Sequence, residues 1–221
     1  MFWSLSGLEE NNNREWFHAQ KERYQEARCA FEELLAGLMR ELRANGEAIP
    51  LFEPKELTFK LMRDTRFSHD KSPYTPCFRA HISKEGKLPV PVGYYLYLRP
   101  GNRSFLGGGL FADMFKDATR LVRDYIAAHG EEWEKLLSEP SFQKTFTVSG
   151  SALKNVPRGY DAAHPQAEYL KNKSWYLEYP VSDEELLAED FPARAVAIFL
   201  RMRPFNAFLN EALKDFSMPK R

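Results

Sequence analysis

The segment 63–74, RDTRFSHDKSPY, carries the densest group of side chains that could bind or transform a ligand. Arg63 and Arg66 offer rigid, bidentate donors that suit a phosphate or a carboxylate. Asp70 could serve as a general base, or it could orient the neighbouring Lys71. No nucleophile stands beside them, so the segment predicts anion binding more directly than it predicts a reaction.

The same charges also admit a purely structural interpretation. Asp64 and Asp70 could neutralise the arginines, while the Ser-Pro pair at 72–73 fixes the turn. The charged loop would then clamp the sheet to the N-terminal helix through Arg14 and Asp64. The sequence leaves open whether Arg66 and Asp70 hold each other or hold a ligand.

Positive charge concentrates around this loop, although the whole chain is neutral. The 221 residues include 31 Lys and Arg and 31 Asp and Glu. Between positions 55 and 84 the excess is +4, from Lys55, Lys60, Arg63, Arg66, Lys71, Arg79 and Lys84 against Glu56, Asp64 and Asp70. The neutral total gives no general attraction to nucleic acid or to an anionic membrane. An anion site would therefore be local.

Alternating apolar and polar residues predict an antiparallel sheet around the loop. The four alternating segments are 57–62, 77–83, 94–99 and 105–110. If the apolar set faces the helices, the opposite face carries Lys60, Arg79, His81, Tyr95, Tyr97 and Arg99. Gly107 and Gly109 share that face and would leave a depression in it. This basic, tyrosine-lined surface could bind an anionic ligand; the alternative is an ordinary solvated face whose glycines permit a bulge.

Helical periodicity predicts helices on both sides of the strand-rich region. A long amphipathic helix is expected over 13–44, with Asn12 and Glu15 as its capping box. The other expected elements are a helix from about Asp113, a short helix around 133–137, strands at 144–149 and 174–181, an acidic turn capped by Asp183, and a last helix over 192–215 that Pro204 could bend. This order predicts an α+β fold: a single domain over 1–221, with a mainly antiparallel sheet, a long N-terminal helix and C-terminal helices covering one face.

A second polar segment, 154–173, is another candidate for binding. Arg158 lies there among prolines and a glycine, in the kind of loop that often carries functional residues. The alternative is a structured connection in which Asp161 and His164 satisfy backbone groups. The histidines show no metal-ligand spacing, so no metal site is predicted. The glycine triplet 107–109 lacks the Lys-Ser/Thr pair of a phosphate-binding P-loop.

Composition and hydropathy predict a soluble, cytoplasmic protein without a membrane partner. The first residues, MFWSLSGLEENNN, have no basic leader and no apolar core of signal-peptide length. No window approaches the ~18 continuous apolar residues of a membrane helix. The two cysteines, Cys29 and Cys77, form neither a disulfide framework nor a zinc spacing.

Four short motifs give the chain a resemblance to a known family. They are NNNREWF at 11–17, RFSHDKSPY at 66–74, LGGGLF at 106–111 and PRGYDAAHP at 157–165. In this order they resemble a widespread conserved-hypothetical family of bacteria and fungi, catalogued as a domain of unknown function. The resemblance covers almost the whole chain, residues 2–213, and implies a single domain. It implies no established activity, cofactor or catalytic residue.

The resemblance also extends to individual positions. The matched residues are Asn12, Arg14, Trp16 and Phe17 in the first motif, Arg63, Asp64, Arg66, Phe67, Ser68, Asp70, Lys71, Pro73 and Tyr74 in the second, and Gly108, Gly109, Gly159, Tyr160 and Pro165 in the later ones. The chain departs from the family at Thr75, where Lys is common, and at Ala112, where Pro is usual. A shared site that used this Lys would lack it here.

Together these patterns predict a protein that binds a small anionic ligand bearing phosphate or carboxylate. The candidate ligand-binding residues are Arg63, Asp64, Arg66, Asp70, Lys71, Tyr74, Arg79, Tyr95, Tyr97 and Arg158. The protein could be an enzyme with Arg66 and Asp70 central, or a structural or protein-interaction module. Nucleic-acid binding through Tyr95 and Tyr97 is a weaker third hypothesis, because the net charge is zero. The sequence identifies no cofactor, catalytic residue or oligomeric state.

Overall fold

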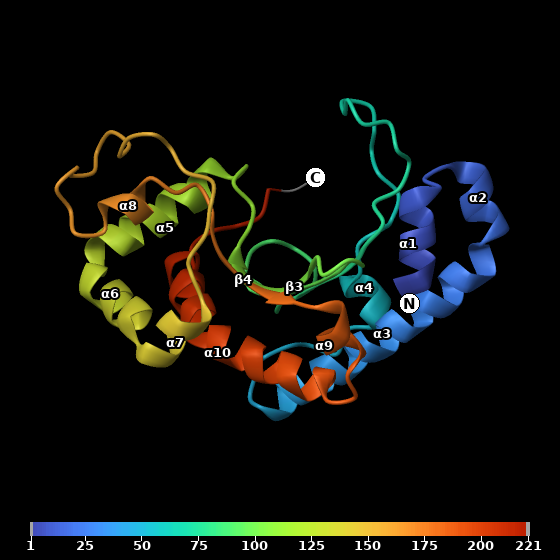
Figure 1. The fold of residues 1–221 in the computed structure, drawn as a ribbon. Coiled ribbons are helices and arrows are strands. Elements are labelled where there is room, and N and C mark those ends of the chain that lie inside the picture. The colour runs from blue at the N-terminus through green and yellow to red at the C-terminus, as the bar shows by residue number, and fades with distance from the viewer. Residues whose placement is uncertain (1, 220–221) are drawn as a thin grey trace.

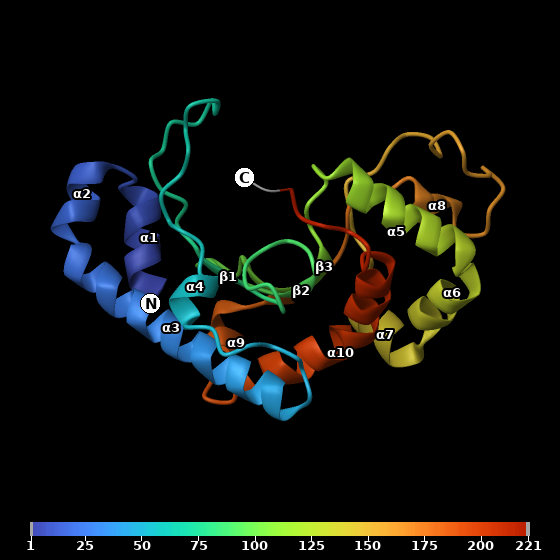
Figure 2. The same ribbon diagram turned by 180° about the vertical axis from the view of Figure 1, so that it is seen from behind.

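A four-stranded antiparallel sheet forms the centre of the structure. The computed structural model describes residues 2–219, with side chains from Ser4 onward. The strands lie in chain order, β1 (Phe78–Ile82), β2 (Gly93–Leu98), β3 (Ser104–Leu110) and β4 (Trp175–Val181). Two long helices, α3 (Lys21–Ala44) and α10 (Phe191–Ala212), lie along one face of the sheet (Figures 1 and 2). The predicted α+β class is confirmed.

Alternation along the strands gives the sheet one buried face. Ala80, Leu96 and Leu106 occupy one cross-strand line of the register, and each is at most 1% exposed. The intervening residues project to the opposite side, because successive side chains of a strand point in opposite directions. No described helix lies over that side in Figure 1 or Figure 2. We call this side the open face.

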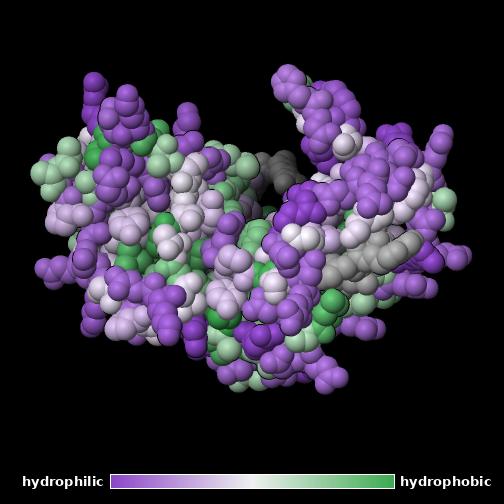
Figure 3. All heavy atoms as spheres, in the orientation of Figure 1, coloured by the Kyte–Doolittle hydropathy of each residue, from purple (hydrophilic) through white to green (hydrophobic). Residues whose placement is uncertain are grey.

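Shorter helices form a lobe at each end of the sheet. One lobe consists of α1 (Phe2–Glu10), α2 (Arg14–Ala19) and the start of α3, and the other consists of α5 (Lys116–Ala128), α6 (Gly130–Ser138), α7 (Pro140–Thr145) and α8 (Ala167–Leu170). Figure 3 shows the surface hollowed between the two lobes. The last described residues extend into this space in both ribbon views, and Phe216 packs on Phe115 with ring centroids 5.9 Å apart.

The predicted helix over 13–44 is two helices. α2 ends at Ala19 and α3 begins at Lys21, with Gln20 between them outside helical geometry. At this bend Phe17 contacts both Tyr24 and Tyr74, with ring centroids 5.0 and 4.3 Å away. The predicted cap is also wrong by one residue.

Asn13, and not Asn12, caps α2. Its side-chain oxygen accepts a hydrogen bond of 2.9 Å from the backbone N–H of Trp16. This is the usual N-cap contact with the third residue of a helix. The side chain of Asn12 is therefore available to hydrogen-bond the backbone of Tyr74.

The predicted strand 57–62 is also wrong. Its first residue ends the short helix α4 (Pro54–Leu57), which the side chains of Glu53 and Glu56 cap reciprocally. The chain then runs back beside residues 73–80 through isolated bridges, Thr58 with Ala80 and Met62 with Tyr74. Residues 62–74 project from the sheet as a narrow hairpin, which we call the arm (Figure 1).

Three further boundaries differ from the sequence prediction. The segment 144–149 is not a strand, because α7 runs to Thr145 from a cap at Glu139 and only Ser149 bridges to β4. α5 begins three residues after Asp113, at Lys116. α9 (Asp183–Leu187) takes Ser182 as its cap. The Asp183 carboxylate instead accepts backbone hydrogen bonds from Gly101 and Asn102.

The C-terminal helix α10 packs very closely against β3. A Cβ at Gly108 would lie 3.0 Å from the sulfur of Met202 and 3.1 Å from the side-chain oxygen of Asn206. The next residue, Gly109, has φ +97°, a conformation that other residues rarely adopt. The helix therefore depends on the glycine triplet for its approach to the sheet. Within residues 2–219, no helix is long and apolar enough to cross a membrane.

Candidate functional site

The open face carries a continuous row of half-buried aromatic side chains. We call it the aromatic row; it consists of Phe59, Tyr95, Tyr97, Phe105, Phe111 and Tyr176. Tyr97 and Phe105 stack across strands with centroids 4.8 Å apart and planes 16° apart. Phe111 and Tyr176 stack at 4.4 Å and 17°. Because the rings cover one another's faces, we infer that solvent chiefly meets their edges.

The predicted depression at the glycines is filled. A Cβ at Gly107 would lie 2.9 Å from the ring of Phe111, which follows β3 and folds back over the open face. The ring of Phe111 lies beside Tyr95, with centroids 5.2 Å apart. A Cβ at Gly109 would meet Trp175 and Phe205, so this residue adds no hollow to the open face. The glycines admit protein side chains here.

Arg79 is a cation of the open face that has no carboxylate partner among the described residues. It pairs with Tyr97 in the β1–β2 register, and its guanidinium carbon lies 5.4 Å from the centre of the Phe59 ring. Burial raises the pKa of Tyr95, and the charge of Arg79 nearby opposes this rise. No ion pair joins Arg79 to any carboxylate of the described residues.

His81 does not add a second positive charge to the open face. The side chain is 6% exposed, and burial lowers its pKa to about 4. Its Nδ1 atom has no hydrogen-bond partner in the described structure. The prediction of an exposed, basic His81 is therefore wrong, because desolvation disfavours the imidazolium form.

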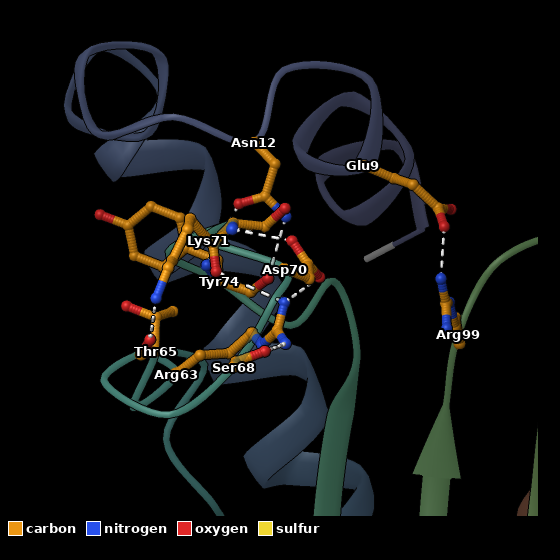
Figure 4. Close-up of polar contacts among 10 residues, drawn as sticks. Glu9, Asn12, Arg63, Thr65, Ser68, Asp70, Lys71, Tyr74 and Arg99 are labelled. Atoms are coloured by element: carbon orange, nitrogen blue, oxygen red, sulfur yellow. Dashed lines mark hydrogen bonds and ion pairs between the residues drawn. The ribbon is translucent and has the colours of Figure 1, made fainter.

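Arg99, which was also expected on this face, is neutralised by Glu9 of α1. Its guanidinium lies 2.5 Å from one Glu9 oxygen (Figure 4), and Arg103 contacts the other. The hydrogen bond from Arg103 is the largest cause that lowers the pKa of Glu9 to about 2, followed by that from Arg99. This cluster joins α1 to the end of β2.

The charged residues of the arm pair with one another in two separate groups. Arg63 contacts Asp70 and lies 3.3 Å from the hydroxyl of Ser68 (Figure 4). Hydrogen bonds from Ser72, and then from Arg63, hold the pKa of Asp70 well below its usual range. The backbone N–H of Ser72 donates to Asp70 at 2.9 Å, as in an Asx turn.

The second group lies towards the tip of the arm. Arg66 is bound to Asp64 at 2.6 Å, and both side chains are more than half exposed. Lys71 donates to the carbonyl of Thr65 at 3.0 Å. Arg66 and Asp70 thus do not hold each other, since each has another partner. Figure 3 shows the arm as a hydrophilic projection.

The base of the arm is attached to the N-terminal helices by Asn12. Its amide donates to the carbonyl of Tyr74 at 2.9 Å and accepts from the backbone N–H of Tyr74 at 3.1 Å (Figure 4). The ring of Tyr74 stacks on Phe17. No ion pair or hydrogen bond joins Arg14 to Asp64 in the described structure. The predicted contact between Arg14 and Asp64 is therefore wrong, and Asn12 and Tyr74 join the arm to the N-terminal helices instead.

Arg158 lies apart from the other candidates. Arg158 is exposed, and the loop that carries it lies beside α5, in the lobe opposite the arm (Figure 1). The neighbouring Tyr160 donates to Asp124 of α5 at 2.6 Å, and burial is the main cause that raises the pKa of Tyr160 to about 12. His164 accepts from the backbone N–H of Gln166 and contacts the carbonyl of Ala127. These contacts support the structural interpretation of this segment.

Of the predicted residues, the structure brings together Arg79, Tyr95 and Tyr97 on the open face. The arm residues form a separate group, and Arg158 belongs to neither group. The sequence prediction did not select Phe59, Phe105, Phe111 or Tyr176. Strand alternation could have identified Phe105, which shares the phase of Gly107, whereas Phe111 lies beyond the strand. No group of three or more His, Cys, Asp or Glu suited to a metal occurs among residues 2–219.

Comparison with protein families gives one match to the chain. A family model described as "Conserved hypothetical protein (DUF2461)" matches residues 2–208. No curated protein and no solved structure matches. The family match spans both lobes, the sheet and the arm.

Proposed function

The chain belongs to the conserved-hypothetical family DUF2461, and, since the description of that family names no activity, we propose from the geometry that the protein binds a small anion on its open face. Arg79 supplies the positive charge, Tyr95 supplies a hydroxyl group beside it, and Tyr97 supplies its ring. The proposal places the ligand in the cytoplasm, the compartment that the composition favours. It assigns no catalytic residue.

The unpaired guanidinium of Arg79 is the observation that carries this proposal. A half-buried arginine normally has an acidic partner, because leaving its charge partly desolvated is unfavourable. Arg63, Arg66 and Arg99 each have such a partner. Arg79 contacts the face of Phe59 and the hydroxyl of Tyr95, and neither of these partners carries a negative charge near pH 7. A carboxylate or phosphate oxygen would complete its contacts with two parallel hydrogen bonds.

The arm residues are less suited to hold the ligand. An anion that bound Arg63 or Arg66 would have to displace a carboxylate already in place, Asp70 or Asp64. Both acids come from the same short hairpin, so their effective concentration at the arginines is high. We therefore keep Arg79, Tyr95 and Tyr97 as the proposed binding residues, and we remove Arg158 and the arm from the site.

A thermal-shift titration of the full chain tests the proposal. The probes are inorganic phosphate, acetate, succinate, a sugar phosphate and a nucleoside monophosphate. A bound anion at ~100 times its Kd should add about 2.7 kcal/mol of stability, a rise in Tm of about 5–10 °C. Arg79→Gln should abolish the rise, whereas Arg158→Gln should retain it. An unchanged Tm with every probe, or equal responses of the two variants, would contradict the proposal.

A structural role for the arm is the second candidate, and the contact between Asn12 and Tyr74 favours it. In this alternative the paired charges keep the arm rigid, and Asn12 fixes its base to the N-terminal lobe. The two roles depend on different residues, because the clamp requires Asn12 and the anion site requires Arg79. Substitution of Asn12 therefore tests the clamp.

A further inference from the structure

The open face exposes more aromatic surface than an anion site alone requires. A phosphate or acetate ion would contact Arg79 and one or two hydroxyls, and would leave the other rings of the aromatic row exposed. Apolar surface that remains exposed is unfavourable unless something covers part of it. The row is half-buried by its own stacking, so the remaining exposed part consists mostly of ring edges.

The edges of aromatic rings select what can lie on them. Each ring carries partial positive charge at its edge and partial negative charge on its face. A ligand ring lying flat across the row would place its face on the edges of Tyr97 and Phe105, which is the favoured T-shaped arrangement. Neighbouring strands are ~4.8 Å apart, so the line from Arg79 through Tyr97 and Phe105 to Pro180 spans about 14 Å. This length accommodates a fused pair of rings and its acidic group.

The charge of the face favours a ligand with one negative charge. Arg79 is its unpaired cation, His81 is neutral near pH 7, and Arg99 is bound to Glu9. Glu178, exposed on β4 in register with Gly107, adds a carboxylate. A dianionic phosphate ester would leave one charge without a partner, and Glu178 would repel a second negative charge on the same face more than a first. A carboxylate matches a single guanidinium with two hydrogen bonds.

We propose that the ligand of the open face is an aromatic monocarboxylate, whose carboxylate binds Arg79 and whose ring lies across the edges of Tyr97 and Phe105. This inference rests on the proposed anion site and adds the class of molecule that occupies it. The proposal concerns reversible binding only and involves no covalent step.

Calorimetric titration of the full chain with 2-naphthoate, acetate, 2-naphthol and inorganic phosphate tests both parts separately. We expect 2-naphthoate to bind at least tenfold more tightly than each of the other three. If acetate or phosphate binds as tightly as 2-naphthoate, the anion site stands and the aromatic class is wrong. If 2-naphthol binds as tightly as 2-naphthoate, the charge of Arg79 has no role and the anion site fails. Absence of binding by all four compounds would overturn both.

Variants then place the ligand on the predicted rings. Arg79→Gln should weaken 2-naphthoate at least tenfold and leave 2-naphthol unchanged. Tyr97→Leu should weaken 2-naphthoate at least fivefold, whereas Tyr97→Phe, which keeps the ring, should stay within twofold of the original chain. If Tyr97→Leu does not fold, as judged by circular dichroism, Phe105→Leu takes its place with the same expectation. Equal affinity in the Leu and Phe variants would contradict the proposed position of the ligand.

Discussion

Replacement of Asn12 by Ala removes the contact that attaches the arm to the N-terminal lobe. The side chain makes two hydrogen bonds to the backbone of Tyr74, at 2.9 and 3.1 Å. Each such bond contributes ~1 kcal/mol, and the loss leaves a partly buried N–H and carbonyl without partners. We therefore expect Asn12→Ala to reduce the free energy of unfolding by about 2 kcal/mol. For a chain of this size, the Tm should fall by about 4–8 °C.

Urea denaturation and hydrogen exchange together measure this effect. The free energy of unfolding comes from the urea midpoint, and the exchange rate of the Tyr74 amide reports the local contact. That amide should exchange faster in Asn12→Ala, while the amides of β3 should change only with global stability. Asn11→Ala is the matched control, because Asn11 is exposed and bonds only to Gly7 within its own lobe.

One result would refute the clamp. If Asn12→Ala and Asn11→Ala have the same stability and the Tyr74 amide stays protected, the two hydrogen bonds do not hold the arm. Asn12→Asp separates the contributions of the two hydrogen bonds, because an ionised carboxylate still accepts from the N–H of Tyr74 but cannot donate to its carbonyl. Its stability should lie between those of the original chain and Asn12→Ala.

Two further predictions concern a charge and a glycine. The pKa of Glu9 is lowered to about 2 in the folded protein from an ordinary value of 4.5. The stability that ionised Glu9 contributes is therefore present above pH 4.5 and is lost as the pH falls towards 2. In urea titrations Glu9→Gln should lose less stability over this range than the original chain, and equal losses would contradict the assignment. Gly109→Ala should destabilise the protein by about 3 kcal/mol or more, since its φ is +97° and the new Cβ would lie 2.4 Å from the carbonyl oxygen of Trp175. The control Gly37→Ala has no atom within 4 Å of its Cβ and, within α3, should raise stability by about 0.5–1 kcal/mol; thermal unfolding that places both variants on the same side of the original chain would refute the argument.

The strands of the sheet were predictable from the sequence where one face of a strand is apolar and the other is polar. β1, β2 and β3 fall within a residue or two of the alternating segments, and β4 falls within a residue of the strand predicted at 174–181. Residues 57–62 alternate equally well, yet they form the end of a helix and an irregular return. The decisive signal was Pro54 between Glu53 and Glu56, a helix start that alternation does not take into account.

The candidate site was predictable only in part, because pairing and packing depend on the folded geometry. The sequence supplied two arginines and two aspartates in the arm, but only the turn determines that Arg63 takes Asp70 and Arg66 takes Asp64. Likewise, Gly107 was correctly placed on the open face. The ring of Phe111 fills its space, and a residue beyond the end of a strand can return over either face.

The glycine triplet of β3 lies against residues on both sides of the sheet. A side chain at each position would collide with different residues: Phe111 at Gly107, Met202 and Asn206 at Gly108, and Trp175 and Phe205 at Gly109. Exchange of Gly107 would displace Phe111 on the open face, whereas exchange of Gly108 or Gly109 would displace α10. One short strand therefore carries both the packing of the open face and the packing of α10, and alanine scanning along it should separate the two: Gly107→Ala should change the open face, whereas Gly108→Ala should change the packing of α10.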